Sequence, residues 1–185
     1  MSSTESGLEK TLEFLQSDEF DKLIAATKEF WDECDYMKKG ASEEEIAVMQ
    51  AHCQKQFGVT VPEGYVAFLR KENGLRYNYN QIYDVEFFTC TDGYRETDWS
   101  VFEYNDDLQD SPGKIRYLYI GYDKENRCAY DTHTGKYVLL KERTFIVLET
   151  YVSFAVLFKT LMMLALPANK LQKIYPHLEG WQKHE

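Results

Sequence analysis

The sequence shows no pattern that is typical of a secretory signal or of a membrane-spanning helix. Its first ten residues, MSSTESGLEK, contain neither the basic nor the apolar region of a secretory signal. The longest apolar run, Ser153 to Leu166, has 14 residues and carries Lys159 in its middle. A helix that spans a bilayer needs about 20 apolar residues. We therefore expect a cytoplasmic protein that does not bind membranes.

The number and spacing of the cysteines do not indicate disulfide bonds either. The chain has four cysteines, widely spaced and with no CxxC pair, which indicates free thiols in a reducing compartment. They are Cys34, Cys53, Cys90 and Cys128. At 185 residues the chain is long enough to bury a sizeable core in one domain without disulfide bonds.

Motifs for nucleotide binding, nucleophilic catalysis and metal binding are missing as well. Neither GxGxxG nor GxxxxGK[ST] occurs, and there is no GxSxG elbow. The histidines are scattered, and His52 and Cys53 are adjacent, so they point to different faces of their helix. Asp84 and Glu86 could form an acid/base pair on one strand face, but we favour a solvated sheet face for them. We expect no enzyme activity, no cofactor and no metal site.

Basic residues are in the minority, with 21 Lys and Arg against 31 Asp and Glu and a net charge of -10. Proteins that bind nucleic acid through its phosphates need clustered Lys and Arg, so this class is excluded. An acidic surface suits a basic protein partner. Solubility alone is the simpler explanation of the charge.

Helical periodicity covers the first part of the chain. Apolar residues recur at helical spacing from Gly7 to Met37 and predict one or two amphipathic helices. Ser42 to Glu45 match a capping box, because the Ser42 hydroxyl can accept from the Glu45 amide while the Glu45 carboxylate reaches back. A helix to about Gln56 should follow.

Two further helices are predicted. The stretch VPEGYVAFLRKENGL should form a short helix that begins at Pro62, whose missing N–H the first turn does not need. Gly74 can close its last turn in the left-handed conformation, and Leu75 can fold back on the helix. Helical periodicity resumes from Glu149 to Leu166 and ends at Pro167.

The segments between these helices have the composition of strands. Aromatic and β-branched residues alternate with polar ones from Gln81 to Thr89. The next three strands are Ile115 to Tyr122, Arg127 to Asp131 and Lys136 to Leu140. The short turns DKEN and THTG between them force antiparallel neighbours.

An acidic segment, Asp92 to Asp110, holds seven carboxylates, the single basic residue Arg95 and several aromatic residues. A solvated loop, or a short acidic helix whose aromatic residues dock onto the sheet, is the simpler interpretation. The alternative is a recognition surface in which aromatic anchors lie within an acidic rim. The first candidates for contact with a partner are Asp92, Glu96, Asp98, Trp99, Glu103, Asp106 and Asp107.

The order of the motifs resembles the SMI1/KNR4 family of the SUKH superfamily, with the bacterial YrhA-like branch as the nearest subgroup. Residues 61–75 resemble the family's Val-Pro, aromatic, Phe-Leu and Asn-Gly signature. Residues 117–140, YLYIGYDKENRCAYDTHTGKYVLL, resemble its Ile-Gly strand and the hairpin that follows. One departure is Gly64, which stands where an acidic or polar residue is more usual.

The resemblance implies an α+β domain, with an antiparallel sheet flanked by helices, that is not an enzyme. Residues 41–167 would form this domain, 1–40 an extra N-terminal helical segment and 168–185 a tail. Many bacterial members are thought to be immunity proteins that neutralise a cognate toxin. A basic toxin such as a nuclease would suit the acidic chain, which we expect to be a monomer or weak homodimer. A regulatory or scaffolding module, or an unrecognised hydrolase, is the alternative.

Overall fold

A computed structural model describes residues 3–28, 40–77, 80–85, 100–108 and 115–177. In this part of the chain the strands form one antiparallel sheet in the order β1-β2-β3-β4-β5-β6. The strands are β1 (Leu75–Tyr77), β2 (Asn80–Ile82), β3 (Tyr117–Asp123), β4 (Asn126–Asp131), β5 (Lys136–Lys141) and β6 (Val147–Tyr151). The predicted α+β class is confirmed.

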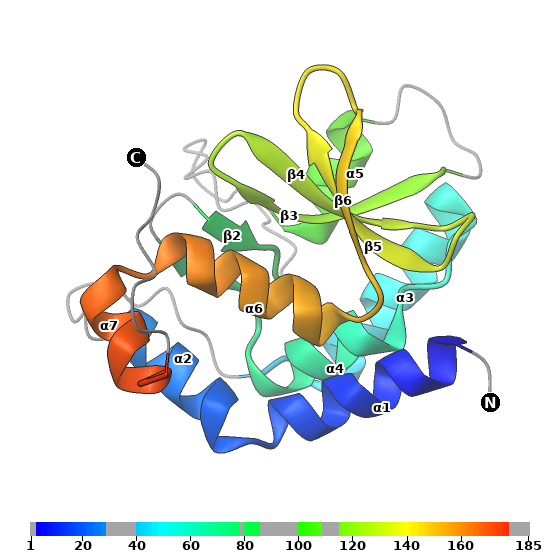
Figure 1. Ribbon diagram of the computed structural model, residues 1–185. Coiled ribbons are helices and arrows are strands. Elements are labelled where there is room, and N and C mark those ends of the chain that lie inside the picture. Colours follow the sequence, from blue (N-terminus) through cyan, green and yellow to red (C-terminus); the bar gives the residue numbers. More distant parts are fainter. Residues whose placement is uncertain (1–2, 29–39, 78–79, 86–99, 109–114, 178–185) are drawn as a thin grey trace, which may run out of the picture.

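Most of the helices lie on one side of this sheet, below it in Figure 1, and α5 (Val101–Leu108) lies behind it. The other helices are α1 (Ser3–Leu15), α2 (Asp18–Lys28), α3 (Glu43–Phe57), α4 (Glu63–Lys71), α6 (Phe154–Ala165) and α7 (Ala168–Ile174). Helices α1, α4 and α6 contact one another, and α6 also contacts β5 and β6. Helix α5 packs against β3, and α7 packs against α2.

The predicted meander is confirmed in β3, β4 and β5, which pair in sequence order with Leu118 opposite Tyr130 and Ala129 opposite Val138. The register of β3 shifts at Ile120, which has no partner on β4 and forms a bulge. The next residue, Gly121, lies so close to β2 that a Cβ atom would meet a backbone oxygen of Gln81 at 2.2 Å. The Ile-Gly motif therefore has a structural role, because it lets β2 approach a bulged strand.

The helix predicted to begin at Pro62 is present as α4, which begins one residue later with Pro62 as its N-cap. The expected C-terminal cap is wrong. The backbone of Glu72 is already extended, at φ -137°, so the helix ends before Gly74. Gly74 does adopt the left-handed conformation, at φ +83°, but it serves the turn into β1, which begins at Leu75.

Side chains of this unit hold the segment that follows β2. The hydroxyl of Tyr65 on α4 donates to the backbone oxygen of Tyr83 at 2.6 Å. The side-chain oxygen of Asn73 accepts from the backbone N–H of Val85 at 3.1 Å. Tyr65 and Asn73 are buried, so these bonds satisfy backbone groups that have no access to water. The aromatic and Asn-Gly motifs thus build the scaffold.

The predicted capping box is also confirmed. The Ser42 hydroxyl accepts from the Glu45 amide at 3.3 Å, and the Glu45 carboxylate accepts from the Ser42 amide at 2.7 Å. Hydrogen bonds from Ser42 hold the pKa of Glu45 below its usual value.

One or two helices were predicted from the periodicity of the N-terminal segment, and its described residues form two, which complete the core. Phe14 of α1 and Phe20 of α2 pack edge to face at 5.5 Å, and Phe158 of α6 packs against both. Glu19 of α2 accepts from Lys159 Nζ at 2.7 Å and from the Tyr175 hydroxyl at 2.6 Å. The N-terminal helices are therefore packed against α6 and tied to Tyr175, the residue after α7.

The helix predicted from Glu149 is wrong over its first residues. Residues 147–151 form the edge strand β6, and α6 begins at Phe154 with Ser153 as its N-cap. The sequence VLETY is rich in β-branched and aromatic residues, and the Ser153 hydroxyl accepts from the Val156 amide at 3.4 Å, which fixes the helix start. The helix α7 also lies in the tail for which no element was predicted.

The strand predicted from Gln81 to Thr89 is shorter in the described residues, since β2 ends at Ile82. Asp84 then forms an isolated parallel bridge with Ser100. The solvated face predicted for Asp84 is wrong, because this residue is only 7% exposed. Its proposed companion Glu86 lies outside the described residues.

Candidate functional site

The acidic segment predicted to bind a partner lies mostly outside the residues that the structure describes. This is the case for Asp92, Glu96, Asp98 and Trp99. Glu103, Asp106 and Asp107 belong to the helix α5, and only the backbone is described at these three positions. Of the candidate residues, the structure therefore describes only the backbone positions of the three that belong to α5.

Helix α5 is fixed to the sheet by a buried amide. The Asn105 side-chain nitrogen donates to the backbone oxygen of Tyr119 at 2.8 Å, and its oxygen accepts from the Tyr119 amide at 2.9 Å. Phe102 is buried and Tyr104 partly buried. These two aromatic residues pack against the body of the protein. This agrees with the simpler interpretation of the segment, a short acidic helix whose aromatic residues dock onto the sheet.

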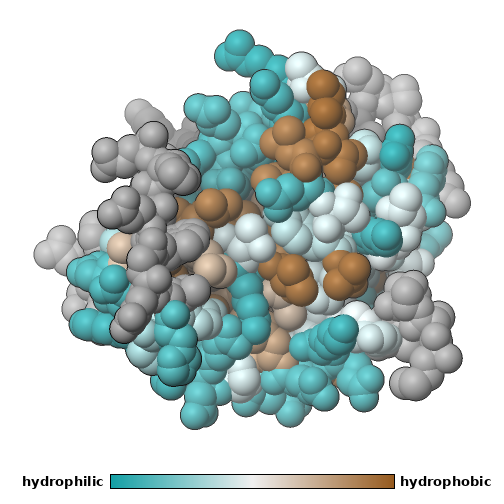
Figure 2. Space-filling model, viewed as in Figure 1, coloured by the Kyte–Doolittle hydropathy of each residue, from teal (hydrophilic) through white to brown (hydrophobic). Residues whose placement is uncertain are grey.

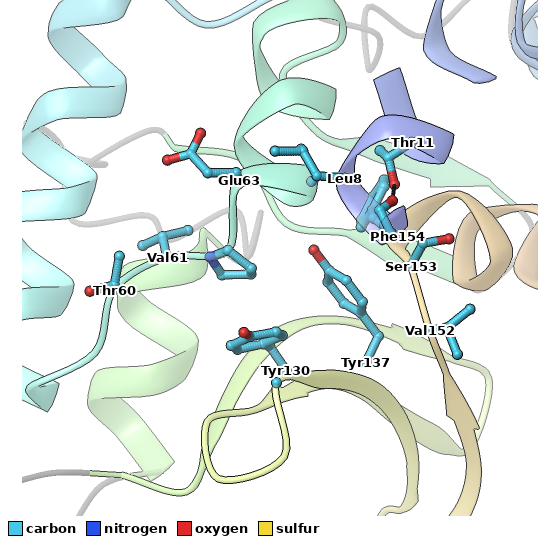
Figure 3. A pocket seen from close by; sticks show the side chains of 14 residues that line it. Leu8, Thr11, Thr60, Val61, Glu63, Tyr130, Tyr137, Val152, Ser153 and Phe154 are labelled. Carbon is cyan, nitrogen blue, oxygen red and sulfur yellow. Dashed lines mark hydrogen bonds between the residues drawn. The ribbon is translucent and has the colours of Figure 1, made fainter. Parts of the chain in front are cut away.

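A recess lies where α1, α4, the β4–β5 turn and the start of α6 meet (Figure 3). Its volume is about 340 Å³. The residues that matter for its chemistry are Thr11, Pro62, Glu63, Gly64, Tyr130, Tyr137, Val152, Ser153 and Phe154. Three of these come from the stretch assigned to the scaffold, and no sequence signal marked them as the wall of a recess.

Two hydroxyl groups of this recess form hydrogen bonds within the protein. The Thr11 hydroxyl donates to the Gly7 carbonyl at 3.0 Å, and the Ser153 hydroxyl caps α6. The Tyr137 hydroxyl lies so near Gly64 that a Cβ there would be 2.9 Å from it, which explains the glycine at this position. Burial raises the pKa of Tyr137 well above its usual value, so its hydroxyl stays neutral. The recess therefore suits an apolar group better than acid/base chemistry.

A second feature is the β5–β6 hairpin, which projects from the body of the molecule (Figure 1). All residues from 141 to 150 are exposed. Four consecutive ones are apolar, and we call them the apolar tip: Phe145 at 45% exposed, Ile146 at 59%, Val147 at 39% and Leu148 at 46%. Figure 2 shows apolar side chains gathered on this projection. Exposed apolar clusters of this kind mark interaction sites in soluble proteins.

The apolar tip is held in a defined position. Phe145 has φ +54°, a left-handed conformation that a bulky residue rarely adopts. Its ring lies 6.0 Å from the guanidinium of Arg127, which also stacks on Tyr104 at 4.9 Å and Tyr119 at 5.8 Å. Arg127 thus links Phe145 of the apolar tip to Tyr104 of α5, so the acidic helix α5 lies beside the apolar tip.

Arg127 has an unusual environment. Its side chain is 13% exposed, and Nη2 lies 3.3 Å from the Glu142 carboxylate. Nε and Nη1 have no hydrogen-bond partner among the residues that the structure describes. Three aromatic faces therefore provide much of the favourable environment for its charge.

Sequence reasoning missed the hairpin because it placed Glu149 in a helix. The signal was present in TFIVLETYV (residues 144–152), which has a strand composition and contains neither Lys nor Pro. Only three residues separate the run from the strand predicted to end at Leu140, and Ser153, which follows the run, is a typical helix N-cap.

The described residues show few features of a reactive site. Among them, no group of three or more His, Cys, Asp or Glu side chains could hold a metal ion. Cys53 and Cys128 are buried, and burial raises the pKa of the Cys128 thiol, which disfavours the nucleophilic thiolate. No helix in this part of the chain is both long and apolar enough to cross a membrane.

Comparison with known families gives one match. The model of the SMI1 / KNR4 family (SUKH-1) matches residues 40–159, about two thirds of the chain. The matched range runs from the residue before Ala41 into α6 and leaves α1, α2 and α7 outside. No curated protein and no solved structure matches the chain. The YrhA-like subgroup and the domain boundaries at residues 40 and 167 stay predictions.

Proposed function

Because the chain belongs to the SMI1/KNR4 family (SUKH-1), we propose that it is a non-enzymatic binding domain that neutralises a cognate toxin of basic charge. The observation that carries this proposal is the apolar tip, four consecutive exposed apolar residues on a projecting hairpin. Complete burial of one such side chain contributes about 1.5–3 kcal/mol. A few of them are enough to anchor a protein partner.

The charge of the chain supports a basic partner. With a net charge of -10, the protein attracts a basic domain over a distance of about a Debye length, roughly 8–10 Å at physiological salt. Attraction of this kind speeds encounter, while buried apolar anchors set the lifetime of the complex. A basic nuclease domain is one toxin class with this chemistry.

The acidic segment forms the rim of the same surface in this proposal. Its helix α5 is linked to the apolar tip through Arg127, which contacts both Tyr104 and Phe145. Asp106→Lys with Asp107→Lys should therefore weaken binding and reduce its dependence on salt. If affinity and salt dependence both stay at the values of the unchanged protein, the acidic rim lies elsewhere.

Affinity capture followed by a growth assay tests the function. The tagged protein is used to capture partners from its native cells at low and at moderate salt, and captured proteins are identified by mass spectrometry. We expect a basic protein that is lost as salt rises, that stops growth when produced alone, and that is harmless when produced together with this chain. Several unrelated partners, or a partner that does not inhibit growth, would favour a regulatory module.

A further inference from the structure

Among the strands that the structure describes, β6 lies at a free edge of the sheet. It is the last strand of the sheet and pairs only with β5 among the described strands. Its residues 147–150 are exposed, so neither face of the strand is covered there by the described part of the chain. An edge strand of this kind presents unpaired backbone N–H and C=O groups to any extended segment that approaches it.

The usual protection of an edge strand is weak here. Edge strands are commonly blunted by Lys, Pro or inward-pointing charges. Residues 144–152 contain no Lys, Arg or Pro and a single acidic residue, Glu149. One protective device is present, because the register shift opposite Leu139 and Leu140 leaves Leu148 without a partner on β5. This bulge lies within the apolar tip and leaves Glu149 to Tyr151 in regular pairing.

The same strand leads to the recess. Val152 follows directly on β6, is 58% exposed, and lines the recess together with Tyr137 and Pro62. Figure 3 shows Val152 at the end of the strand, beside Ser153 and Phe154 at the start of α6. A segment that runs along β6 therefore passes from the apolar tip to the mouth of a cavity of about 340 Å³.

We propose that β6 receives an extended segment of a basic partner protein, which adds to the sheet as a further strand and places an apolar side chain in the recess. In such strand addition the backbone hydrogen bonds supply affinity and pockets for side chains supply specificity. This inference rests on the proposed function, because it names the surface of the molecule that would bind the toxin.

Charge decides between a basic partner and a second copy of this chain. Two copies would each bring a net charge of -10 to the interface, whereas a basic segment gains from the same field. The exposed charges of the hairpin, Lys141, Glu142, Arg143 and Glu149, sum to zero and do not oppose either occupant. The charge of the whole molecule therefore favours the basic partner.

A model peptide tests the surface without a toxin. The probe is a fluorescent ten-residue peptide in which valine and lysine alternate, and its controls have glutamate in place of lysine or a central proline. Binding is measured by fluorescence anisotropy, and amide hydrogen exchange of residues 141–152 is measured with and without the peptide. We expect only the valine-lysine peptide to bind and the β6 amides to gain protection.

Two double variants locate the contact. Ile146→Lys with Leu148→Lys changes the apolar tip, while the control Leu12→Lys with Val48→Lys makes the same charge change at exposed apolar residues of α1 and α3. The tip variant should weaken peptide binding at least about tenfold, and the control less than about twofold. Circular dichroism confirms that both variants fold.

Three results would overturn the surface: equal binding of the glutamate peptide, equal weakening of binding by both double variants, or no gain of protection at the β6 amides. A concentration-dependent dimer that the tip variant abolishes would assign β6 to a second copy. If a toxin is captured and binds the tip variant as tightly as the unchanged protein, the proposed function stands but this surface does not. Peptide binding at β6 without any toxin leaves the surface standing without that function.

Discussion

Gly121 and Gly64 show how single residues fix this fold through close approach. A Cβ on Gly121 would lie 2.2 Å from a backbone oxygen of Gln81, and one on Gly64 would lie 2.9 Å from the Tyr137 hydroxyl. The two contacts differ in whether the neighbouring atoms can move aside. The obstacle at Gly121 is backbone within a paired sheet, whereas the obstacle at Gly64 is the end of a side chain.

Gly121→Ala should therefore be strongly destabilising. Overpacking of this kind costs about 1–3 kcal/mol, and the β2–β3 pairing has no flexible atom that can move aside. Urea unfolding followed by circular dichroism measures the change. A midpoint equal to that of the unchanged protein would show that β2 is not held close to β3.

Tyr65→Phe isolates one buried hydrogen bond. The hydroxyl donates to the Tyr83 carbonyl at 2.6 Å, and Tyr65 is fully buried. Loss of the donor leaves a buried carbonyl unpaired, so the free energy of unfolding should fall by about 1–3 kcal/mol. Tyr117→Phe on β3, where the side chain is only partly buried, is the control and should change stability less. Equal effects in both variants would contradict the assignment.

At the scale of elements, the unit from Val61 to Leu75 has two tasks. Tyr65 and Asn73 hold the segment after β2, while Pro62 and Glu63 form one wall of the recess. A family motif read as scaffold thus also shapes a cavity. The sequence alone does not reveal the second task, because the opposite walls come from α1, β5 and α6, far away along the chain.

The N-terminal helices are tied to the rest of the fold by Glu19, and this tie should depend on pH. Burial alone would raise the pKa of Glu19, but hydrogen bonds from Lys159 and Tyr175 and the charge of Lys159 lower it overall. A carboxyl whose pKa is lower in the folded state stabilises the protein above its unfolded pKa and loses that contribution as the pH falls through the folded value.

Glu19→Gln should therefore be less stable than the unchanged protein at pH 7, by about 0.5–1 kcal/mol, since the site is partly exposed. The difference should shrink below about pH 5, the range in which an ordinary Glu carboxyl becomes protonated in the unfolded chain. Urea unfolding from pH 3 to 7 measures it, with the exposed residue Glu44 changed to Gln as control. A difference that stays constant with pH would rule out this role of Glu19.

Local signals allowed some elements to be predicted and left others out. The capping box at Ser42 and the short turns of the meander act within a few residues, and the structure confirms both. The strand β6 was missed because it runs directly into an apolar helix, and only Ser153 separates the two patterns. The recess and the contact of Arg127 with Phe145 arise from tertiary packing, which no short motif encodes.

At the scale of the whole molecule, the acidic charge and the apolar tip oppose each other. An exposed apolar hairpin promotes association, whereas a net charge of -10 keeps copies of the chain apart. The balance lasts only while the carboxylates are ionised. The isoelectric point is near 4.9, so the repulsion disappears as the pH falls towards that value.

The protein should therefore self-associate as the pH approaches 5, through the apolar tip. Light scattering at fixed concentration from pH 7.5 to 5 should rise steeply for the unchanged protein and much less for Ile146→Lys with Leu148→Lys. The variant Leu12→Lys with Val48→Lys has the same raised isoelectric point, so it separates the effect of charge from the loss of apolar surface at the tip. If the two variants scatter alike, charge alone controls association, because removal of the exposed apolar side chains of the hairpin then has no effect of its own.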